Sequence, residues 1–330
     1  MVKNGLLHAA RRGGMFALSR RASRKSLRIL AYHGLWTTPG YQYGNYLFMT
    51  PEQFERRMIW LRNSCYPVLR LGAALQRLDQ GDLPDHAVVI TIDDGWSSTY
   101  THMLPVLERL GLPATVYATT WYSENQLPVI NVAVDYILRR TGQPRGQLPE
   151  LVGEIEQSPS IEERERVLRQ CAARFGVPTA PWWEGRQFHV MSKAEIGDAD
   201  RRGLDIQLHT HRHRSGMANC DNLAREIGDN RAALAAACGR PGQSFRHFCY
   251  PSGDAPLSAA GILKSLGIGS ATLVEPGLNP PGANPYRLYR YLDGRAVSDV
   301  EFEAYLSGAH AAYRAVRTAS RLLTRPRRAS

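Results

Sequence analysis

The sequence predicts one α/β domain in which parallel strands alternate with helices. The first observation is the repeated order of short apolar segments and amphipathic segments along almost all of the 330 residues. The second is that polar residues follow several apolar segments directly, as they do at the carboxyl ends of strands in parallel sheets and barrels. A barrel and an open sheet both fit these two observations.

The first half of the chain reads as a series of strand and helix pairs. The segment 50–53 (Thr-Pro-Glu-Gln) is typical of a helix start, because Thr is a preferred N-cap, Pro suits the first helical position and Gln suits the third. We expect strands at 26–32, 68–69, 87–92 and 114–118, and helices from residue 50 onwards, at 71–79 and at 98–110.

The second half opens with an insertion and then returns to the alternation. The loop 275–285 is rich in proline and glycine, which excludes regular structure there. We expect a mostly helical insertion at about 128–187, helices at 191–202, 219–238, 256–266 and 298–318, and strands at 204–208, 245–249, 268–272 and 287–292. The expected organisation is a basic segment at 1–27, a central domain at 28–295 and a helix with a basic tail at 296–330.

Positive charge gathers at the two ends of a chain whose formal net charge is +11. Contact with an anionic membrane face, an acidic polymer or nucleic acid is one interpretation, and solvated tails that aid solubility are the other. The segment 1–27 suits either an amphipathic helix that lies on a surface or a disordered leader. No nucleic-acid recognition motif accompanies the charge, so we expect no nucleic-acid partner.

The compartment is inferred from two further features. The sequence has neither an apolar stretch long enough to span a bilayer nor the apolar core of a secretory signal. Its five cysteines are scattered without a Cys-x-x-Cys pair, which indicates reduced thiols: Cys65, Cys171, Cys220, Cys238 and Cys249. We therefore expect a cytoplasmic protein, with peripheral contact at the inner membrane face as an extension.

Asp93 and Asp94 follow the apolar run that ends at Ile92. Adjacent side chains on a strand point to opposite faces, so both carboxylates reach one site only if the chain turns, and Gly95 permits a turn. One carboxylate could then bind a metal while the other takes a proton from water. An isolated Asp-Asp-Gly is more often simply a turn.

His209 and His213 follow the apolar segment 204–208. On a helical turn, positions i and i+4 share a face, so two imidazoles can point at one ion, whereas His211 would face elsewhere. A polar histidine-rich loop explains the tract alone equally well. Together with the aspartate pair at another strand end, metal binding becomes the better hypothesis.

The segment 248–253 (Phe-Cys-Tyr-Pro-Ser-Gly) is expected to be a turn after a strand. Backbone N–H groups in such a turn can stabilise an oxyanion. A purely supporting loop is an equally good interpretation.

These motifs resemble those of the polysaccharide deacetylases, carbohydrate esterase family four. The family's Thr-Phe-Asp-Asp-Gly is matched at 91–95 with Ile92 for Phe, and its His-Ser/Thr-x-x-His at 209–213. The Leu-x-Tyr-His at 30–33, the Leu-Pro-Ala-Thr at 112–115 and the Phe-x-Tyr-Pro-x-Gly at 248–253 fit one branch of the family. The resemblance covers about residues 28–292, and the first two motifs together are specific.

The resemblance implies a distorted parallel (β/α) barrel with fewer than eight regular strands and a single divalent ion. Asp94, His209 and His213 would hold the ion, which we take as zinc with cobalt, nickel and manganese as alternatives. Asp93 would be the general base, and the backbone N–H of Tyr250 would stabilise the oxyanion. Arg290 resembles a late family arginine that orients the base.

The sequence departs from the family in two respects: Arg246 lies near the position of the third motif's arginine without a clean match, and the late Leu-x-His motif that supplies a general acid is absent. His310, His247, His33 and His211 are candidate replacements, and none has the expected context. The remaining residues that we assign to substrate binding or to support of the ligands are His33, Trp96, Pro251 and Arg246.

The expected function is removal of an N-acetyl group from an N-acetylated sugar, which yields acetate and a free amine. Surface or exopolysaccharide synthesis is the expected setting, and a lipid-linked intermediate at the membrane would suit the basic ends. One alternative is a deacylase of a small amide or of a secondary-metabolite sugar. Another is a non-catalytic carbohydrate-binding descendant, which the intact Asp93 argues against.

Overall fold

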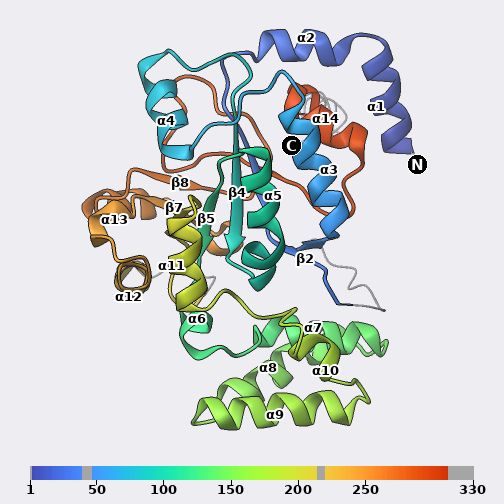
Figure 1. Ribbon diagram of the computed structural model, residues 1–330, viewed down its shortest axis with the longest axis vertical. Coiled ribbons are helices and arrows are strands. Elements are labelled where there is room, and N and C mark those ends of the chain that lie inside the picture. The colour runs from blue at the N-terminus through green and yellow to red at the C-terminus, as the bar shows by residue number, and fades with distance from the viewer. Residues whose placement is uncertain (1, 39–46, 214–219, 311–330) are drawn as a thin grey trace, which may run out of the picture.

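The computed structural model describes residues 2–38, 47–213 and 220–310, and within them seven strands form one parallel sheet (Figure 1). The strands lie in the order β8-β7-β6-β5-β4-β1-β9. Their bounds are β1 (Arg28–Tyr32), β4 (Val88–Asp94), β5 (Thr115–Ala118), β6 (Asp205–Leu208), β7 (His247–Cys249), β8 (Ser270–Thr272) and β9 (Tyr291–Leu292). The predicted parallel α/β fold is confirmed.

One irregular segment, residues 288–292, joins the two edges of this sheet. Leu288 forms a parallel bridge with Thr272 of β8, and three residues later Tyr291 pairs with Leu30 of β1. The sheet therefore curls into a barrel whose seam lies between β8 and β9. The fold is the distorted (β/α) barrel with fewer than eight regular strands that the resemblance implied.

Helices cover the outside of the barrel. All seven residues of β4 are buried, which explains its continuous apolar run, since strands of parallel sheets are covered on both faces. Thr50 caps the first covering helix by accepting a hydrogen bond from the Gln53 N–H, as expected. The covering helices are α3 (Pro51–Arg62), α4 (Leu71–Gln80), α5 (Leu104–Leu110), α11 (Lys193–Arg201), α12 (Cys220–Cys238) and α13 (Ala259–Ser265).

A group of helices between β5 and β6 lies beyond the carboxyl end of β4 (Figure 1). It comprises α6 (Trp121–Asn125), α7 (Ile130–Arg140), α8 (Leu148–Glu156), α9 (Ile161–Arg174) and α10 (Ala180–Trp183). Its apolar cluster includes Tyr136 and Phe188 and continues into Trp96 and Phe48, whose ring centroids are 5.1 Å apart. Phe48 lies on β3 (Phe48–Met49), which pairs with β2 (Gly34–Leu35). These helices thus face the end of the barrel where the polar motifs gather.

The basic N-terminal segment is helical, so the disordered-leader alternative is wrong for its described residues. Helices α1 (Val2–Arg12) and α2 (Met15–Ala22) pack on α14 (Asp299–Ser307), with Leu7 and Phe16 buried against Val300 and Ala304. The helix expected at 298–318 ends at Ser307 instead, because Gly308 adopts a left-handed φ of 79°. Residues 311–318 of that prediction lie outside the described part of the chain.

Among the described residues, no helix combines the length and the apolar character that crossing a bilayer requires.

Candidate active site

Strand register brings the polar motifs to one edge of the sheet. Asp94 of β4 pairs with Ala118 of β5, Ala118 with Leu208 of β6, and Leu208 with Phe248 of β7. The residues that follow these strands therefore lie at the same level, at the carboxyl end of the barrel. This is the end that carries the active site in enzymes of this architecture.

The turn after β4 begins at Asp94, one residue before the glycine that the sequence suggested would permit it. Asp94 already has a φ of 66° and Gly95 a φ of 75°. Aspartate is among the few residues that enter the left-handed region as single residues. Because Asp94 leaves strand geometry, its carboxylate turns toward β6 while Asp93 keeps its strand direction into the barrel.

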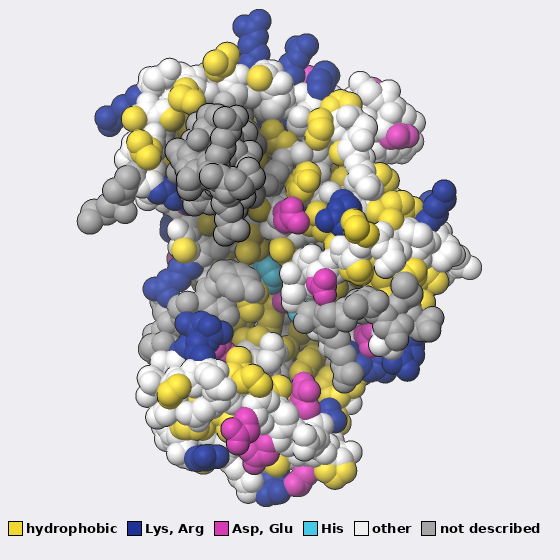
Figure 2. All heavy atoms as spheres, turned by 180° about the vertical axis from the view of Figure 1, so that it is seen from behind, with side chains coloured by type: hydrophobic (Ala, Val, Ile, Leu, Met, Phe, Trp, Pro, Cys, Tyr) yellow, Lys and Arg dark blue, Asp and Glu magenta, His cyan; other side chains and the backbone are white. Residues whose placement is uncertain are grey.

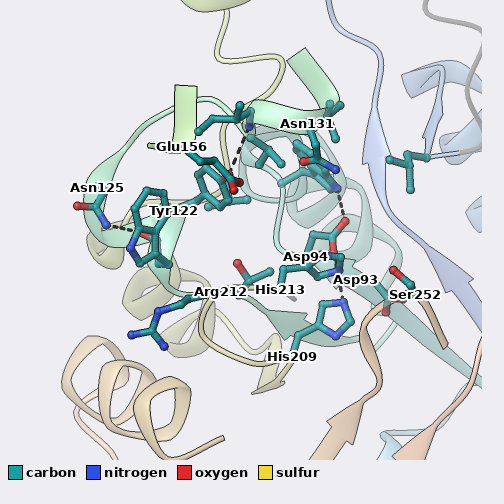
Figure 3. Close-up of a pocket in the computed structure, with 18 of the residues that line it drawn as sticks. Asp93, Asp94, Tyr122, Asn125, Asn131, Glu156, His209, Arg212, His213 and Ser252 are labelled. Carbon is teal, nitrogen blue, oxygen red and sulfur yellow. Dashed lines mark hydrogen bonds and ion pairs between the residues drawn. The ribbon is translucent and has the colours of Figure 1, made fainter. Parts of the chain in front are cut away.

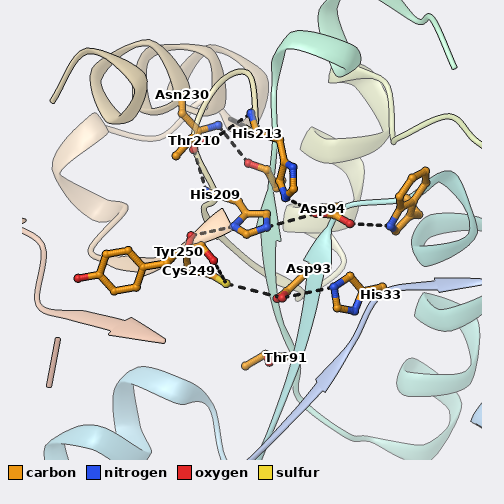
Figure 4. Close-up of polar contacts among 12 residues, drawn as sticks. His33, Thr91, Asp93, Asp94, His209, Thr210, His213, Asn230, Cys249 and Tyr250 are labelled. Carbon is orange, nitrogen blue, oxygen red and sulfur yellow. Dashed lines mark hydrogen bonds and ion pairs between the residues drawn. The ribbon is translucent and has the colours of Figure 1, made fainter. Parts of the chain in front are cut away.

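Asp94, His209 and His213 meet at one point, as Figure 4 shows. Nε2 of each histidine lies 3.2 Å from the same atom, Asp94 Oδ1. That oxygen is buried and accepts no hydrogen bond from the described residues. One carboxylate oxygen and two imidazole nitrogens around a shared point are the donors that zinc and similar divalent ions accept, and three protein ligands leave a coordination position open. The residues present therefore fit a divalent ion.

The local structure of residues 209–213 differs from the expected helical turn. Thr210 has a φ of 66° and His213 a φ of 50°, so the chain is not a right-handed helix there. The Thr210 hydroxyl accepts a hydrogen bond from the His213 N–H (3.1 Å) and closes the loop. The i,i+4 argument was wrong in its geometry, although the two rings do converge, with centroids 4.9 Å apart.

His211 faces elsewhere, as predicted. Its Nδ1 lies 2.8 Å from the hydroxyl of Thr120, and its Nε2 lies 3.9 Å from a carboxylate oxygen of Glu124.

Two contacts orient two of the three candidate ligands, Asp94 and His209. Trp96, which the sequence assigned to a supporting or substrate-binding role, donates from its indole N–H to Asp94 Oδ2 (2.9 Å). This leaves Oδ1 directed at the histidines. The Nδ1 of His209 lies 2.8 Å from the carbonyl oxygen of Cys249, which selects the tautomer whose Nε2 can bind a metal.

Helix α12 supplies two supporting residues that sequence reasoning missed. The buried Asn230 side chain accepts a hydrogen bond from the His209 N–H (3.0 Å) and donates to the Ala118 carbonyl (3.0 Å). One helical turn earlier, Glu226 accepts from the Arg212 N–H (2.7 Å). Both ends of the strained ligand loop are thus fixed to one helix face. A sequence pattern could have indicated them: Glu226 and Asn230 are polar residues four apart within the apolar stripe of a helix.

Replacing Asn230 by Ala is expected to weaken metal binding by about 10- to 100-fold, the usual effect of losing a residue that orients a ligand. The Kd for zinc, measured by competition with a chromogenic chelator, tests this. Asn222→Ala is the matched control, because Asn222 is exposed on the same helix. An unchanged Kd for Asn230→Ala would show that the loop does not depend on α12.

Asp93 lies beside the candidate ligands and forms a bidentate ion pair with Arg290. Nη1 of Arg290 lies 2.6 Å from Asp93 Oδ1, and Nη2 lies 2.7 Å from Oδ2. Nε of Arg290 donates to the Leu273 carbonyl (2.7 Å), which anchors the guanidinium in the barrel interior. Burial alone would raise the pKa of Asp93, but the charge and hydrogen bonds of Arg290 outweigh burial and lower that pKa. Asp93 is therefore held as a carboxylate.

Cys249 is a further residue at the site that the sequence did not single out. Its buried Sγ lies 3.1 Å from Nη2 of Arg290 and 3.6 Å from Oδ2 of Asp93. Its position could have indicated this, because Cys249 is the last residue of a strand and immediately precedes the Tyr-Pro turn.

His33 directly follows β1 and lines the same cavity as Asp93. Its Nε2 lies 3.8 Å from Asp93 Oδ2. Burial lowers the pKa of His33, and the neighbouring carboxylates of Asp93 and Asp94 offset only part of that effect. Pro251 is buried at the start of the turn that follows β7, and its supporting role stays a prediction.

Two of the predicted site residues do not have the predicted geometry. The N–H of Tyr250 donates to the Thr272 carbonyl (3.2 Å) in the ladder between β7 and β8, so it is not available to an oxyanion. Arg246 is wrong as a site residue, because it is exposed and precedes β7, at the amino end of the barrel. The backbone N–H of Arg246 donates to Gln207, which pins the start of the strand.

A cavity of about 1270 Å³ extends from the candidate ligands to the helices beyond the barrel. Histidine side chains are visible in the hollow between the two parts of the molecule in Figure 2. In Figure 3, Asn131 and Glu156 lie across the cavity from His209. The site therefore has two walls, one from the barrel and one from the helices between β5 and β6.

Fold and site together define a class of protein: a (β/α) barrel with an Asp-His-His cluster and a second, ionised aspartate at the carboxyl ends of its strands. The family model of the polysaccharide deacetylases matches residues 80–271. The chain belongs to the polysaccharide deacetylase family, whose members are hydrolases that act on carbon–nitrogen bonds.

Individual relatives agree with this assignment. The YxkH protein of Bacillus subtilis (strain 168), whose name places it among the polysaccharide deacetylases, is 35% identical over 92 residues. That match covers 28% of this chain and only 31% of YxkH.

Solved structures match over a larger share of the chain. The Streptococcus pyogenes deacetylase PplD, solved with acetate, has a TM-score of 0.59 at 15% identity, covering 85% of this chain and 98% of PplD. IcaB from Ammonifex degensii has a TM-score of 0.58 at 20% identity, and the match covers 86% of this chain and 97% of IcaB. At these identities the likeness establishes the fold.

Proposed function

We propose that the protein is a metal-dependent N-deacetylase of an N-acetylated glycan, in which Asp94, His209 and His213 bind one divalent ion, with zinc as the expected ion. The observation that carries the proposal is the convergence of both histidine Nε2 atoms, each at 3.2 Å, on the buried Oδ1 of Asp94. Membership of the deacetylase family indicates that the bond broken is the carbon–nitrogen bond of an acetamido group.

The ion, when bound, would polarise the acetyl carbonyl and make an adjacent water more acidic. Asp93 is the proposed general base, since Arg290 holds it ionised beside the ligands. It takes a proton from the water that attacks the carbonyl carbon. The carbon–nitrogen bond then breaks, and acetate and a sugar amine leave.

The leaving amine needs a proton, and we propose His33 as its donor. Apart from the two candidate ligands, His33 is the one histidine that lines the cavity within the described chain. Its Nε2 lies 3.8 Å from Asp93 Oδ2, so a proton taken by Asp93 can pass to His33 over a short path. Among the candidates from the sequence, His211, His247 and His310 do not line the cavity.

Metal removal tests the proposal. Protein stripped with a chelator should release no acetate from N-acetylglucosamine oligomers, and added zinc or cobalt should restore release. His209→Ala and His213→Ala should lose both metal and activity, whereas the control His211→Ala should keep the metal. Acetate release that persists in chelator, or a parent protein that binds no ion at any concentration, would contradict the proposal.

The setting that we propose is surface or exopolysaccharide synthesis in the cytoplasm, with α1 and α2 touching an anionic membrane. Their exposed Leu6, Met15 and Leu18, with exposed fractions of 55%, 52% and 70%, lie among arginines and support such contact. Cosedimentation with phosphatidylglycerol vesicles tests it. If the triple variant Leu6→Ser, Met15→Ser, Leu18→Ser cosediments with vesicles to the same extent as the parent, the proposed membrane contact is contradicted.

The position of α2 indicates how a lipid-linked substrate would lie relative to the cavity. The Arg24 carbonyl, two residues after α2, accepts from the His86 N–H just before β4, so α2 lies near the amino ends of the strands. The cavity lies at the carboxyl ends, beyond a seven-residue strand of about 3.3 Å per residue. A membrane that binds α1 and α2 would lie opposite the cavity, which favours a glycan that extends away from the membrane.

A further inference from the structure

The cavity is larger than the removal of one acetyl group requires. At about 1270 Å³ it exceeds the roughly 300–1,000 Å³ that is usual for small-molecule sites. Its lining continues past the candidate ligands to Trp121 of α6 and Arg164 of α9. The reacting acetamido sugar accounts for the part near Asp94 and leaves this second part to be explained.

The backbone of Trp121 is fixed beside the ligand loop. Its backbone N–H donates to the His211 carbonyl (2.8 Å), and its backbone carbonyl accepts from the side chain of Asn125 (2.7 Å). Its ring is only partly buried and packs edge-on against Tyr122, with centroids 4.8 Å apart. A part-exposed indole offers a flat apolar surface on which the C–H face of a pyranose can pack.

Arg164 adds hydrogen-bond donors to the same wall. Its guanidinium carbon lies 5.4 Å from the centroid of the Trp121 ring, and its Nε donates to the Ser158 carbonyl (3.1 Å). Within the described chain no carboxylate lies within ion-pair distance of Arg164. Arg212, the other arginine of the cavity, differs in this respect, because Glu226 and Asp229 lie 2.7 and 3.0 Å from its Nη1.

We propose that Trp121 and Arg164 form a subsite for a second sugar unit of the same glycan, with Trp121 packing against its ring and Arg164 donating to its oxygens. The inference rests on the proposed deacetylase function and specifies its substrate class as an oligosaccharide or polysaccharide. A monosaccharide or a small amide would leave this wall unused.

The test compares acetate release from monomers, dimers and tetramers of N-acetylglucosamine and of N-acetylgalactosamine by the zinc-loaded protein. We expect kcat/KM to rise from monomer to dimer. Trp121→Ala and Arg164→Ala should each reduce that rise about tenfold, the effect of losing a hydrogen bond to a charged group or a packed ring. Arg164→Lys should recover part of it.

Trp183 and Arg169 provide a matched control, because Arg169 stacks on Trp183 at 3.8 Å elsewhere in the same group of helices. Trp183→Ala and Arg169→Ala should leave the length dependence unchanged. Equal kcat/KM for all lengths, or equal losses in the control pair, would overturn the subsite while leaving the deacetylase function intact. Absence of release from every probe would contradict the deacetylase function itself.

Discussion

Asp93→Asn is expected to lower kcat by about 10²- to 10⁴-fold, the range associated with loss of a general base. Asparagine keeps the shape of the side chain and its place beside the candidate ligands, but it cannot take a proton from water. Metal content should stay at the parent level, because Asp93 is not among the three side chains that meet at Asp94 Oδ1. Acetate release and zinc content, measured on the same preparations, test both parts.

The change also leaves Arg290 buried beside a neutral partner, so some loss of stability should accompany it. A thermal unfolding scan separates this loss from the catalytic effect. Asp198→Asn is a matched control on the surface, where the side chain is 33% exposed. An Asp93→Asn protein that is folded, metal-loaded and fully active would remove Asp93 from the reaction.

Local patterns predicted most of the fold, and the seam of the barrel was the exception. Each strand and helix of the alternation has its own periodicity, cap or terminating glycine, so nearby residues specify it. The closing segment was predicted as a strand at 287–292, of which only Tyr291–Leu292 forms β9, and its pattern does not show that Leu288 pairs with β8 while Tyr291 pairs with β1. Only the arrangement of the other strands determines where that segment lies, so the strand pattern left barrel and open sheet unresolved and the family resemblance alone favoured the barrel.

The difference between local patterns and long-range pairing also explains which site residues were predicted. Asp94, His209 and His213 stand in short motifs directly after strands, and strand register then brings them together. Asn230 lies 21 residues from its partner His209, and no local signal connects the two. The expectation for the Tyr250 N–H was wrong because the pairing of β7 with β8 uses that N–H, and pairing is a property of two strands.

Arg290→Met is expected to reduce the free energy of unfolding by about 3–5 kcal/mol, the cost of breaking a buried ion pair by removing one partner. Both members of the pair are buried, with side-chain exposures of 0% and 2%. Methionine fills much of the space but leaves the Asp93 carboxylate without its bidentate donor. Burial would then raise the pKa of Asp93, opposed only by the weaker contributions of His33 and His209. Urea denaturation measures the first effect, and acetate release near neutral pH should fall with it.

The double variant Asp93→Asn, Arg290→Met distinguishes an unpaired charge from lost packing. If the unpaired carboxylate causes the loss, the double variant should be more stable than Arg290→Met alone, because it removes the second charge as well. Additive losses from the two changes would instead mean that Arg290 acts through packing and through its bond to the Leu273 carbonyl. Arg287→Met controls for the substitution itself, since Arg287 is half-buried and its guanidinium donates to the Ala255 carbonyl. Strong coupling in this cycle would establish Arg290 as the residue that keeps the base ionised inside the barrel.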